Sequence, residues 1–427
     1  MNAAIIFILL LTLMLTGMPI SISLGLTVLT FLFGFTEVPL ESVALKLFTG
    51  IEKFEIMAIP FFILAGNFLT HGGVARRMIN FASSMVGHWY GGLGLAGVLG
   101  CALFAAVSGS SPATVVAIGS ILLPAMTKAG FPKSFGAGVI TTSGALGILI
   151  PPSIVMVMYS VATNTSVGAL FMAGVVPGIA LAGVLGGVTW YRARKFGYPR
   201  LPKATWAERI KAFRASAWGL LLIVIVMGGI YTGMFTPTEA AAMSAVYAFF
   251  VAVFIYKDMK LKDVPKVLLN SANMSAMLLY IITNAVLFSF IMTNENIPQA
   301  LADWMLGNGL GMITFLLATN VILLLAGNFM EPSSIVLIFA PILFPVAMKL
   351  GIDPVHFGII MVVNMEVGMC HPPVGLNLYV ASGITKMGIT ELTVAVWPWL
   401  LSMLAFLMVV TYWPGLSTWF PRMLGMM

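Results

Sequence analysis

Long apolar runs follow one another along the whole chain of 427 residues, separated by short polar or Gly/Pro-rich interruptions. Residues 20–35, 219–230 and 313–326 are examples of such runs. An α-helix needs about 20 mostly apolar residues to cross the hydrocarbon core of a bilayer. The pattern therefore predicts an all-α integral membrane protein whose helices contact the lipid bilayer.

The same plan occurs twice in this pattern. A shift of 221 residues carries 121–152 onto 342–373, and with it the pair Pro151-Pro152 onto Pro372-Pro373. In an apolar chain, two halves with Gly/Pro-interrupted segments at matching places are typical of a secondary transporter. The predicted organisation is a first repeat at 1–190, a basic cytoplasmic linker at 191–215 and a second repeat at 216–427.

Composition agrees with a membrane protein and excludes a water-soluble fold. Hydrophobic residues make up 60% of the chain and charged residues only 8%, whereas a soluble globular chain carries roughly 25% charged residues. The net charge of +7 does not indicate nucleic acid as a partner, because the basic residues fall in loops between apolar runs. The two cysteines, Cys101 and Cys370, lie in apolar contexts, so we expect buried free thiols.

The positions of lysine and arginine predict the orientation in the membrane. Eight of these residues lie in 192–214 and four in 257–266, and the segment between the two loops is long enough for two spans. Two crossings return the chain to the same side, so both loops are predicted to face the cytoplasm. On this topology 17 lysines and arginines lie inside and four outside. Both termini are then external, and the two repeats have inverted topology.

One polar interruption in each repeat predicts a re-entrant helical hairpin. The first hairpin is expected at 91–127 with its tip at 108–112, and the second at 310–349 with its tip at 327–333. The arms of these hairpins are short for a full crossing, so each tip is expected inside the protein. The alternative is an ordinary turn outside the membrane.

A second interruption in each repeat predicts a broken helix, at 134–165 and at 354–386. Each contains glycines followed by a proline pair, Pro151-Pro152 or Pro372-Pro373. Proline lacks an N–H group and clashes with the preceding helical turn, so the helix is expected to unwind there. Irregular backbone at membrane depth is tolerated where it lines a cavity or binds a ligand. A simple kink is the alternative.

Each hairpin tip and the break that follows it supply the donors of a small-cation site. Backbone carbonyls and Ser, Thr or Asn oxygens suit a hard cation, and the N-termini of half-helices attract an anion. Glu331 and Glu366 are the carboxyl groups within these interrupted segments. Each is interpreted as a proton carrier, as a neighbour of a cation site, or as a hydrogen-bonded structural group near the aqueous entrance.

These motifs resemble those of a known transporter family. The pair SGSSPATVVAIGSILLPAM with GILIPPS, and the pair GNFMEPSSIVLIFAPILFPVAM with GMCHPPVG, are similar to the large membrane (M) subunit of tripartite ATP-independent periplasmic (TRAP) transporters. The resemblance covers essentially the whole chain. It implies an elevator-type secondary transporter fold, with a scaffold from 1–70 and 216–291 and a transport domain from 91–190 and 310–427.

The resemblance also implies the activity and the partners. The family takes up organic acid anions, with a C4-dicarboxylate favoured here, by symport with Na+ across the bacterial inner membrane. The implied partners are a small four-span membrane subunit (Q type) and a periplasmic substrate-binding protein (P type). Both termini of this chain would be periplasmic. Neither a cofactor nor a metal other than Na+ is implied.

Site residues are carried over by motif. The resemblance implies a first Na+ site formed by Ser108, Ser110, Ser111, Ser143, Gly144 and Gly147. It implies a second Na+ site formed by Asn328, Glu331, Ser333, Ser334, Asn364, Met365 and Gly368. The substrate is implied to lie between them, near Ser110, Ser111, Thr142, Ser333 and Asn364.

The same residues leave some other functions open and disfavour others. Uptake of sialic acid or another monocarboxylate or sugar acid fits the same fold, as does a proton-coupled organic-anion transporter that relies on Glu331 and Glu366. An enzyme is not expected, because no HExxH motif, GxSxG motif or Asp pair occurs, and no catalytic residue is predicted. A channel fits poorly with two symmetric pockets.

Overall fold

A computed structural model of the protein describes residues 2–36, 38–309, 311–328, 330–373 and 375–427. All regular structure in these residues is helical, and eight of the helices are long and apolar enough to cross a membrane. Helices satisfy their backbone hydrogen bonds internally, which a bilayer requires because it offers no water. The prediction of an all-α membrane protein is confirmed.

The first half of the chain forms ten α-helices in the described residues. A 3₁₀ turn, η1 (Phe54–Met57), precedes α4, and a second one, η2 (Gly144–Ile148), follows α8. The helices are α1 (Asn2–Leu15), α2 (Ile20–Phe35), α3 (Leu40–Thr49), α4 (Ala58–His71), α5 (Val74–Val86), α6 (Gly92–Ser108), α7 (Ser111–Lys128), α8 (Lys133–Ser143), α9 (Ile154–Thr163) and α10 (Val167–Lys195).

The second half follows the same order, except that one long helix, α13, takes the place of α3 and α4, and it ends with an additional helix. A π-helical turn, η3 (Val251–Ile255), extends α12, and a 3₁₀ turn, η4 (Leu261–Asp263), precedes α13. The helices are α11 (Trp206–Tyr231), α12 (Pro237–Phe250), α13 (Val264–Asn294), α14 (Ile297–Gly307), α15 (Met312–Gly327), α16 (Pro332–Lys349), α17 (Pro354–Cys370), α18 (Leu376–Thr385), α19 (Ile389–Tyr412) and α20 (Gly415–Met423).

The interrupted segments lie where the two repeats match. The hairpins are α6–α7 and α15–α16, and the interrupted helices are α8–η2–α9 and α17–α18. Leu310, the predicted start of the second hairpin, lies outside the described residues. Both proline pairs, Pro151-Pro152 and Pro372-Pro373, contain a cis peptide bond. The division into scaffold and transport domain stays a prediction.

The two breaks differ in one respect from the sequence expectation. In the first repeat, the α-helix already ends at Ser143 and continues as a 3₁₀ turn before the proline pair. In the second repeat, α17 stays α-helical through Asn364 and Gly368 and ends only at Cys370. The first break has two glycines, at 144 and 147, whereas the second has one, and glycine weakens a helix by its conformational freedom.

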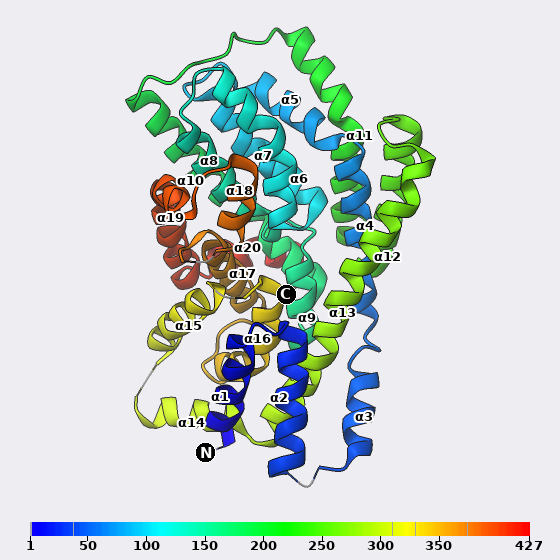
Figure 1. Ribbon diagram of the computed structural model, residues 1–427, viewed down its shortest axis with the longest axis vertical. Helices are drawn as coiled ribbons and strands as arrows, with labels where there is room; N and C mark the ends of the chain where they lie inside the picture. Colours follow the sequence, from blue (N-terminus) through cyan, green and yellow to red (C-terminus); the bar gives the residue numbers. More distant parts are fainter. Residues whose placement is uncertain (1, 37, 310, 329, 374) are drawn as a thin grey trace.

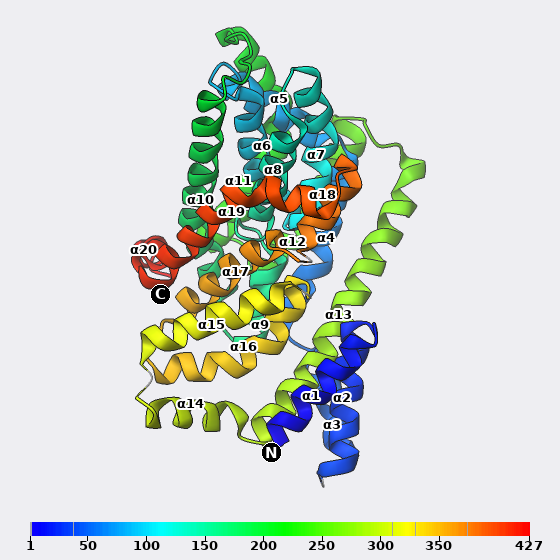
Figure 2. The same ribbon diagram turned by 60° about the vertical axis from the view of Figure 1, so that its left-hand side comes forward.

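The two basic loops lie toward the same end of the molecule. The linker between α10 and α11 and the connection between α12 and α13 both lie at the upper end, and the N-terminus lies at the lower end (Figure 1 and Figure 2). The short helices α5 and α14 lie at opposite ends of the molecule (Figure 1). The side of the membrane that each end faces stays a prediction.

Matching helices of the two repeats also pack on one another. α10 and α19, the last long helices of their repeats, are in contact, and the indole Nε1 of Trp399 donates to the hydroxyl of Thr189 at 2.9 Å. Both side chains are fully buried. The two cysteines, Cys101 and Cys370, are buried free thiols, as the sequence predicts.

Candidate functional site

The first hairpin tip is a tight turn rich in oxygen atoms. α6 ends at Ser108 and α7 begins at Ser111, and Gly109 between them lies in the left-handed region with φ of 59°. The hydroxyl oxygens of Ser108 and Thr114 are 2.9 Å apart, and the Thr114 hydroxyl donates to the carbonyl oxygen of Ser110 at 2.8 Å. Hydroxyl and carbonyl oxygens are the ligands that a hard cation prefers.

The first break packs directly on this tip. A Cβ atom added at Gly147 would lie 2.6 Å from the carbonyl oxygen of Ser110 and 2.7 Å from the amide nitrogen of Ser111. Only glycine lets the two backbones approach this closely. A Cβ atom at Gly144 would overlap the Val115 side chain of α7 in the same way. The fold therefore gathers five of the predicted residues at this tip: Ser108, Ser110, Ser111, Gly144 and Gly147.

The last two residues of α8 are fully buried beside the break. The hydroxyl of Thr142 donates to the carbonyl oxygen of Gly138 at 2.9 Å, so its proton is committed to its own helix. The hydroxyl of Ser143 has no hydrogen-bond partner within the described residues. An unsatisfied buried hydroxyl costs about 1–3 kcal/mol. A bound cation next to Ser143 would remove that cost.

The second hairpin tip supplies its oxygens from different side chains. The Ser334 hydroxyl donates to Oε1 of Glu331 at 3.4 Å, and Nδ1 of His371 is hydrogen-bonded to Oδ1 of Asn328 at 3.0 Å. Ser333 is buried beside them. Glu331 occupies the position of Ser110 in the first repeat, so the second tip carries a carboxyl group that the first tip lacks.

The second break approaches its hairpin through two glycines. A Cβ atom added at Gly368 of α17 would lie 3.1 Å from Cα of Gly327, the last residue of α15. One turn earlier, Nδ2 of Asn364 donates to the carbonyl oxygen and to Oδ1 of Asn320 in α15, at 3.0 and 2.9 Å. The predicted residues Asn364, Met365 and Gly368 are thus buried against the second hairpin, and Oδ1 of Asn364 has no partner among the described residues.

Asn377, in the first turn of α18, contacts the first hairpin tip although no local sequence pattern predicts it. Its Nδ2 donates to the hydroxyl of Ser111 at 2.7 Å, and that hydroxyl is 3.1 Å from its Oδ1. The two residues are 266 positions apart, so no local pattern connects them. A usable signal exists in the repeat, because Asn377 falls on Met156 when the halves are aligned.

The half-helix α9 begins next to the first break and ends against the segment that joins α3 to α4. The Ser153 hydroxyl caps its N-terminus, whose positive dipole end can attract an anion. At the other end, Nζ of Lys53 donates to the carbonyl oxygen of Val161 at 2.5 Å and to Oδ1 of Asn164 at 2.7 Å. Burial lowers the pKa of Lys53, against the opposing effect of the nearby Glu55 carboxylate.

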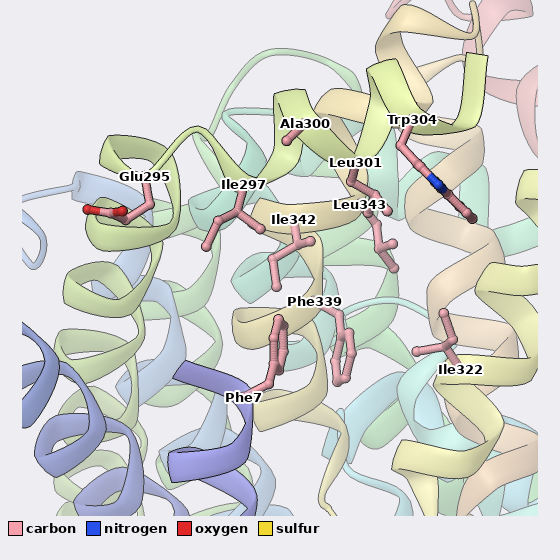
Figure 3. Close-up of a pocket in the computed structure, with 10 residues that line it drawn as sticks. All are labelled: Phe7, Glu295, Ile297, Ala300, Leu301, Trp304, Ile322, Phe339, Ile342 and Leu343. Atoms are coloured by element: carbon pink, nitrogen blue, oxygen red, sulfur yellow. The ribbon is translucent and has the colours of Figure 1, made fainter. Parts of the chain in front are cut away.

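The cavity shown in Figure 3 lies away from both hairpin tips and both breaks. It has a volume of about 650 Å³ and lies between α1, α14 and the second hairpin. Its lining is apolar except for Glu295, whose side chain points away from the others, and for the indole of Trp304 (Figure 3). None of the predicted site residues lines it. This chemistry suits hydrocarbon and does not suit an anion or Na+.

Comparison with known proteins identifies the family of the chain. The family described as "Tripartite ATP-independent periplasmic transporter, DctM component" matches residues 7–416. The chain is 76% identical to a C4-dicarboxylate TRAP transporter large permease protein of Rhodobacter capsulatus, over all of both chains. It is 36% identical to a sialic acid TRAP transporter large permease protein of Vibrio cholerae, over 96% of each.

A solved structure has a similar fold. The YdaH transporter of Alcanivorax borkumensis, described as having an unusual topology, aligns with a TM-score of 0.60 over 88% of this chain and 89% of that chain. The sequence identity is 15%. The likeness therefore concerns the fold alone, that of a helical membrane transporter.

Proposed function

The chain belongs to the DctM component family of tripartite ATP-independent periplasmic transporters, and from that premise we propose that it is the large permease subunit of a Na+-coupled uptake system for C4-dicarboxylates. The substrate class is supported by the full-length relative from Rhodobacter capsulatus, at 76% identity, which is named for C4-dicarboxylates. Sialic acid is less well supported, because the relative named for it is 36% identical.

The observation that carries the Na+ proposal is a close backbone approach that occurs in both repeats, against Ser110 and Ser111 in the first and against Gly327 in the second. In each half, a glycine of the break, Gly147 or Gly368, approaches the backbone at its hairpin. The first contact places the Ser110 carbonyl oxygen beside the break, and the second tip supplies oxygens of Asn328, Ser334 and the single carboxyl group of Glu331. That donor set suits a hard monovalent cation, and helix ends at a break add favourable dipoles.

The anion lies between the two tips in this proposal. Two bound Na+ ions offset the charge of a dicarboxylate dianion, and the N-terminus of α9 adds a positive dipole end. Moving one net charge across the membrane exchanges about 2.3 kcal/mol per 100 mV. With two Na+ per dianion no net charge moves, so the Na+ concentration gradient drives transport.

Alternating access follows from an elevator movement in this proposal. The segments 91–190 and 310–427 carry both hairpins and move as a transport domain along a scaffold from 1–70 and 216–291. Binding of both ions pre-organises the site for the anion before the movement. The working complex includes the small four-span membrane subunit and a periplasmic binding protein in the bacterial inner membrane.

The test is uptake of radiolabelled succinate by proteoliposomes that contain the complex. Replacing Na+ by choline at constant pH should abolish uptake, whereas a proton-coupled carrier would keep it. Ser110→Leu and Asn364→Leu should each remove Na+-dependent uptake, while Ser120→Leu, an exposed position on α7, should retain it. Unchanged uptake in both site variants would refute the assignment of these residues.

A further inference from the structure

Asn377 joins the second repeat to the hairpin tip of the first. It is fully buried in the first turn of α18, and its amide contacts the Ser111 hydroxyl at 2.7 and 3.1 Å. Its Nδ2 is also 3.4 Å from the carbonyl oxygen of Thr141 in α8 and 3.8 Å from Sγ of Cys370. The Cys370 thiol donates to the same Thr141 carbonyl at 3.4 Å. One side chain therefore contacts a tip, a break and the end of α17.

This contact joins the half-helix of the second repeat to the hairpin tip of the first, and the matching positions of the other pair cannot form it. The shift of 221 residues places Asn377 on Met156 and Ser111 on Pro332. Neither a thioether nor a proline side chain can form the hydrogen bonds that Asn377 and Ser111 share. If the contact only served to close a hairpin against a half-helix, the fold would need it in both repeats. The second hairpin closes without it.

The hydrogen bonds of this pair are exchangeable. A serine hydroxyl has one proton and two lone pairs, and an asparagine amide both donates and accepts. In the first arrangement Nδ2 of Asn377 donates to the Ser111 oxygen and occupies a lone pair. In the second, Ser111 donates to Oδ1 and Nδ2 donates to the Thr141 carbonyl. The second arrangement leaves both lone pairs of Ser111 free for a cation, whereas the first arrangement leaves only one.

We propose that Asn377 is a positioning residue that transmits cation occupancy of the first hairpin site to the second broken helix through this exchange. The inference rests on the proposed Na+ site at Ser111. Since α18 follows directly after the second break, turning the Asn377 amide changes how that helix is held. Filling the first site then favours the ion-binding arrangement of the second, which gives positive cooperativity between the two Na+ ions.

The first measurement is the Na+ activation curve of uptake by the complex in proteoliposomes. Asn377→Leu removes both hydrogen-bonding groups. The Hill coefficient for Na+ should therefore fall toward one, and the half-saturating Na+ concentration should rise about fivefold or more, as for a typical coupling between sites. Asn377→Asp keeps an acceptor for Ser111 and removes the donor, so the half-saturating concentration should fall. Asn284→Leu, a buried asparagine of α13 that bonds within its own helix, should leave the Hill coefficient unchanged.

The second measurement needs no transport. Cys370 contacts Asn377, so the rate at which N-ethylmaleimide alkylates Cys370 reports whether this contact is intact. The rate is measured in the detergent-solubilised complex of a Cys101→Ser variant, which lacks the other thiol. Na+ should slow this reaction when Asn377 is present and have no effect in Asn377→Leu.

The outcomes separate the inference from the proposed function. If the unaltered protein shows Na+-dependent uptake, and Asn377→Leu keeps its Hill coefficient and its Na+ protection of Cys370, the positioning role is refuted while Na+ coupling stands. A folded Asn377→Asp protein with an unchanged half-saturating concentration would also refute it. Absence of any Na+ effect in the unaltered protein would refute the proposed Na+ coupling itself.

Discussion

Replacing Gly147 by alanine tests the contact between the first break and the first hairpin tip. The added Cβ atom would lie 2.6 Å from the carbonyl oxygen of Ser110 and 2.7 Å from the nitrogen of Ser111. Both are backbone atoms, so the overlap cannot be relieved by rotating a side chain. The break and the tip must therefore move apart, and the oxygen atoms that the proposed Na+ site needs move apart with them.

The magnitude follows from the cost of overpacking. Inserting a methyl group into a closely packed site costs about 1–3 kcal/mol. If the strain is relieved when the tip opens and is present when Na+ closes it, the half-saturating Na+ concentration rises about 5- to 150-fold. Gly368→Ala should have a smaller effect, because its Cβ atom would lie 3.1 Å from Cα of Gly327, at a distance that a small shift relieves.

The assay is the Na+ dependence of dicarboxylate uptake in proteoliposomes, with expression and thermal unfolding in detergent as measures of folding. Gly187→Ala is the matched control, since a Cβ atom there would meet nothing within 4 Å. It lies inside α10, where alanine stabilises a helix by about 0.5–1 kcal/mol relative to glycine. A folded Gly147→Ala protein with an unchanged Na+ activation curve would refute the reasoning, as would a larger effect of Gly368→Ala.

Two further predictions concern other contacts. Lys53 bonds to the end of α9 at Val161 and Asn164, and the proposed elevator movement carries α9 past it. Linking Lys53→Cys to Asn164→Cys with a short bis-methanethiosulfonate should therefore stop uptake until a reductant is added, and unimpaired uptake by the cross-linked protein would contradict this movement. Thr189→Val leaves the buried indole N–H of Trp399 without its partner and should destabilise the protein by about 1–3 kcal/mol. Thermal unfolding in detergent measures this loss, and Trp399→Phe added to Thr189→Val should then cost less than Trp399→Phe alone.

The fold could be predicted from the sequence where backbone chemistry decides it. Proline pairs at 151 and 372 interrupt helices wherever they stand, and a polar tip inside an apolar stretch requires a turn that the protein itself encloses. The exact form of the second break could not be predicted. The second break has one glycine where the first has two, and whether α17 then unwinds at Asn364 or continues to Cys370 also depends on packing against α15, which the local sequence does not describe.

The candidate site could be predicted only within each repeat. The repeat locates the tip and the break, and the family resemblance of these motifs implies Ser108, Ser110 and Gly147; the fold brings the three together, and their role stays a prediction. The partners Asn377 and Asn320 could not be identified in this way. Their contacts join elements that are distant in the sequence, and a buried asparagine in an apolar helix has no periodic signature of its own.

Comparison of the two repeats distinguishes residues that the backbone fold requires from residues that supply particular side-chain groups. Positions that agree after the shift, such as Gly147 with Gly368 and the proline pairs, are those where two backbones meet or a helix must stop. Positions that disagree, such as Ser110 with Glu331 and Met156 with Asn377, place hydrogen-bonding or acidic groups in one half only. The backbone plan is therefore symmetric, whereas the groups that would bind or sense an ion are not. In a duplicated chain, a polar residue aligned with an apolar one inside a matching segment is thus the position to examine first for a specific role.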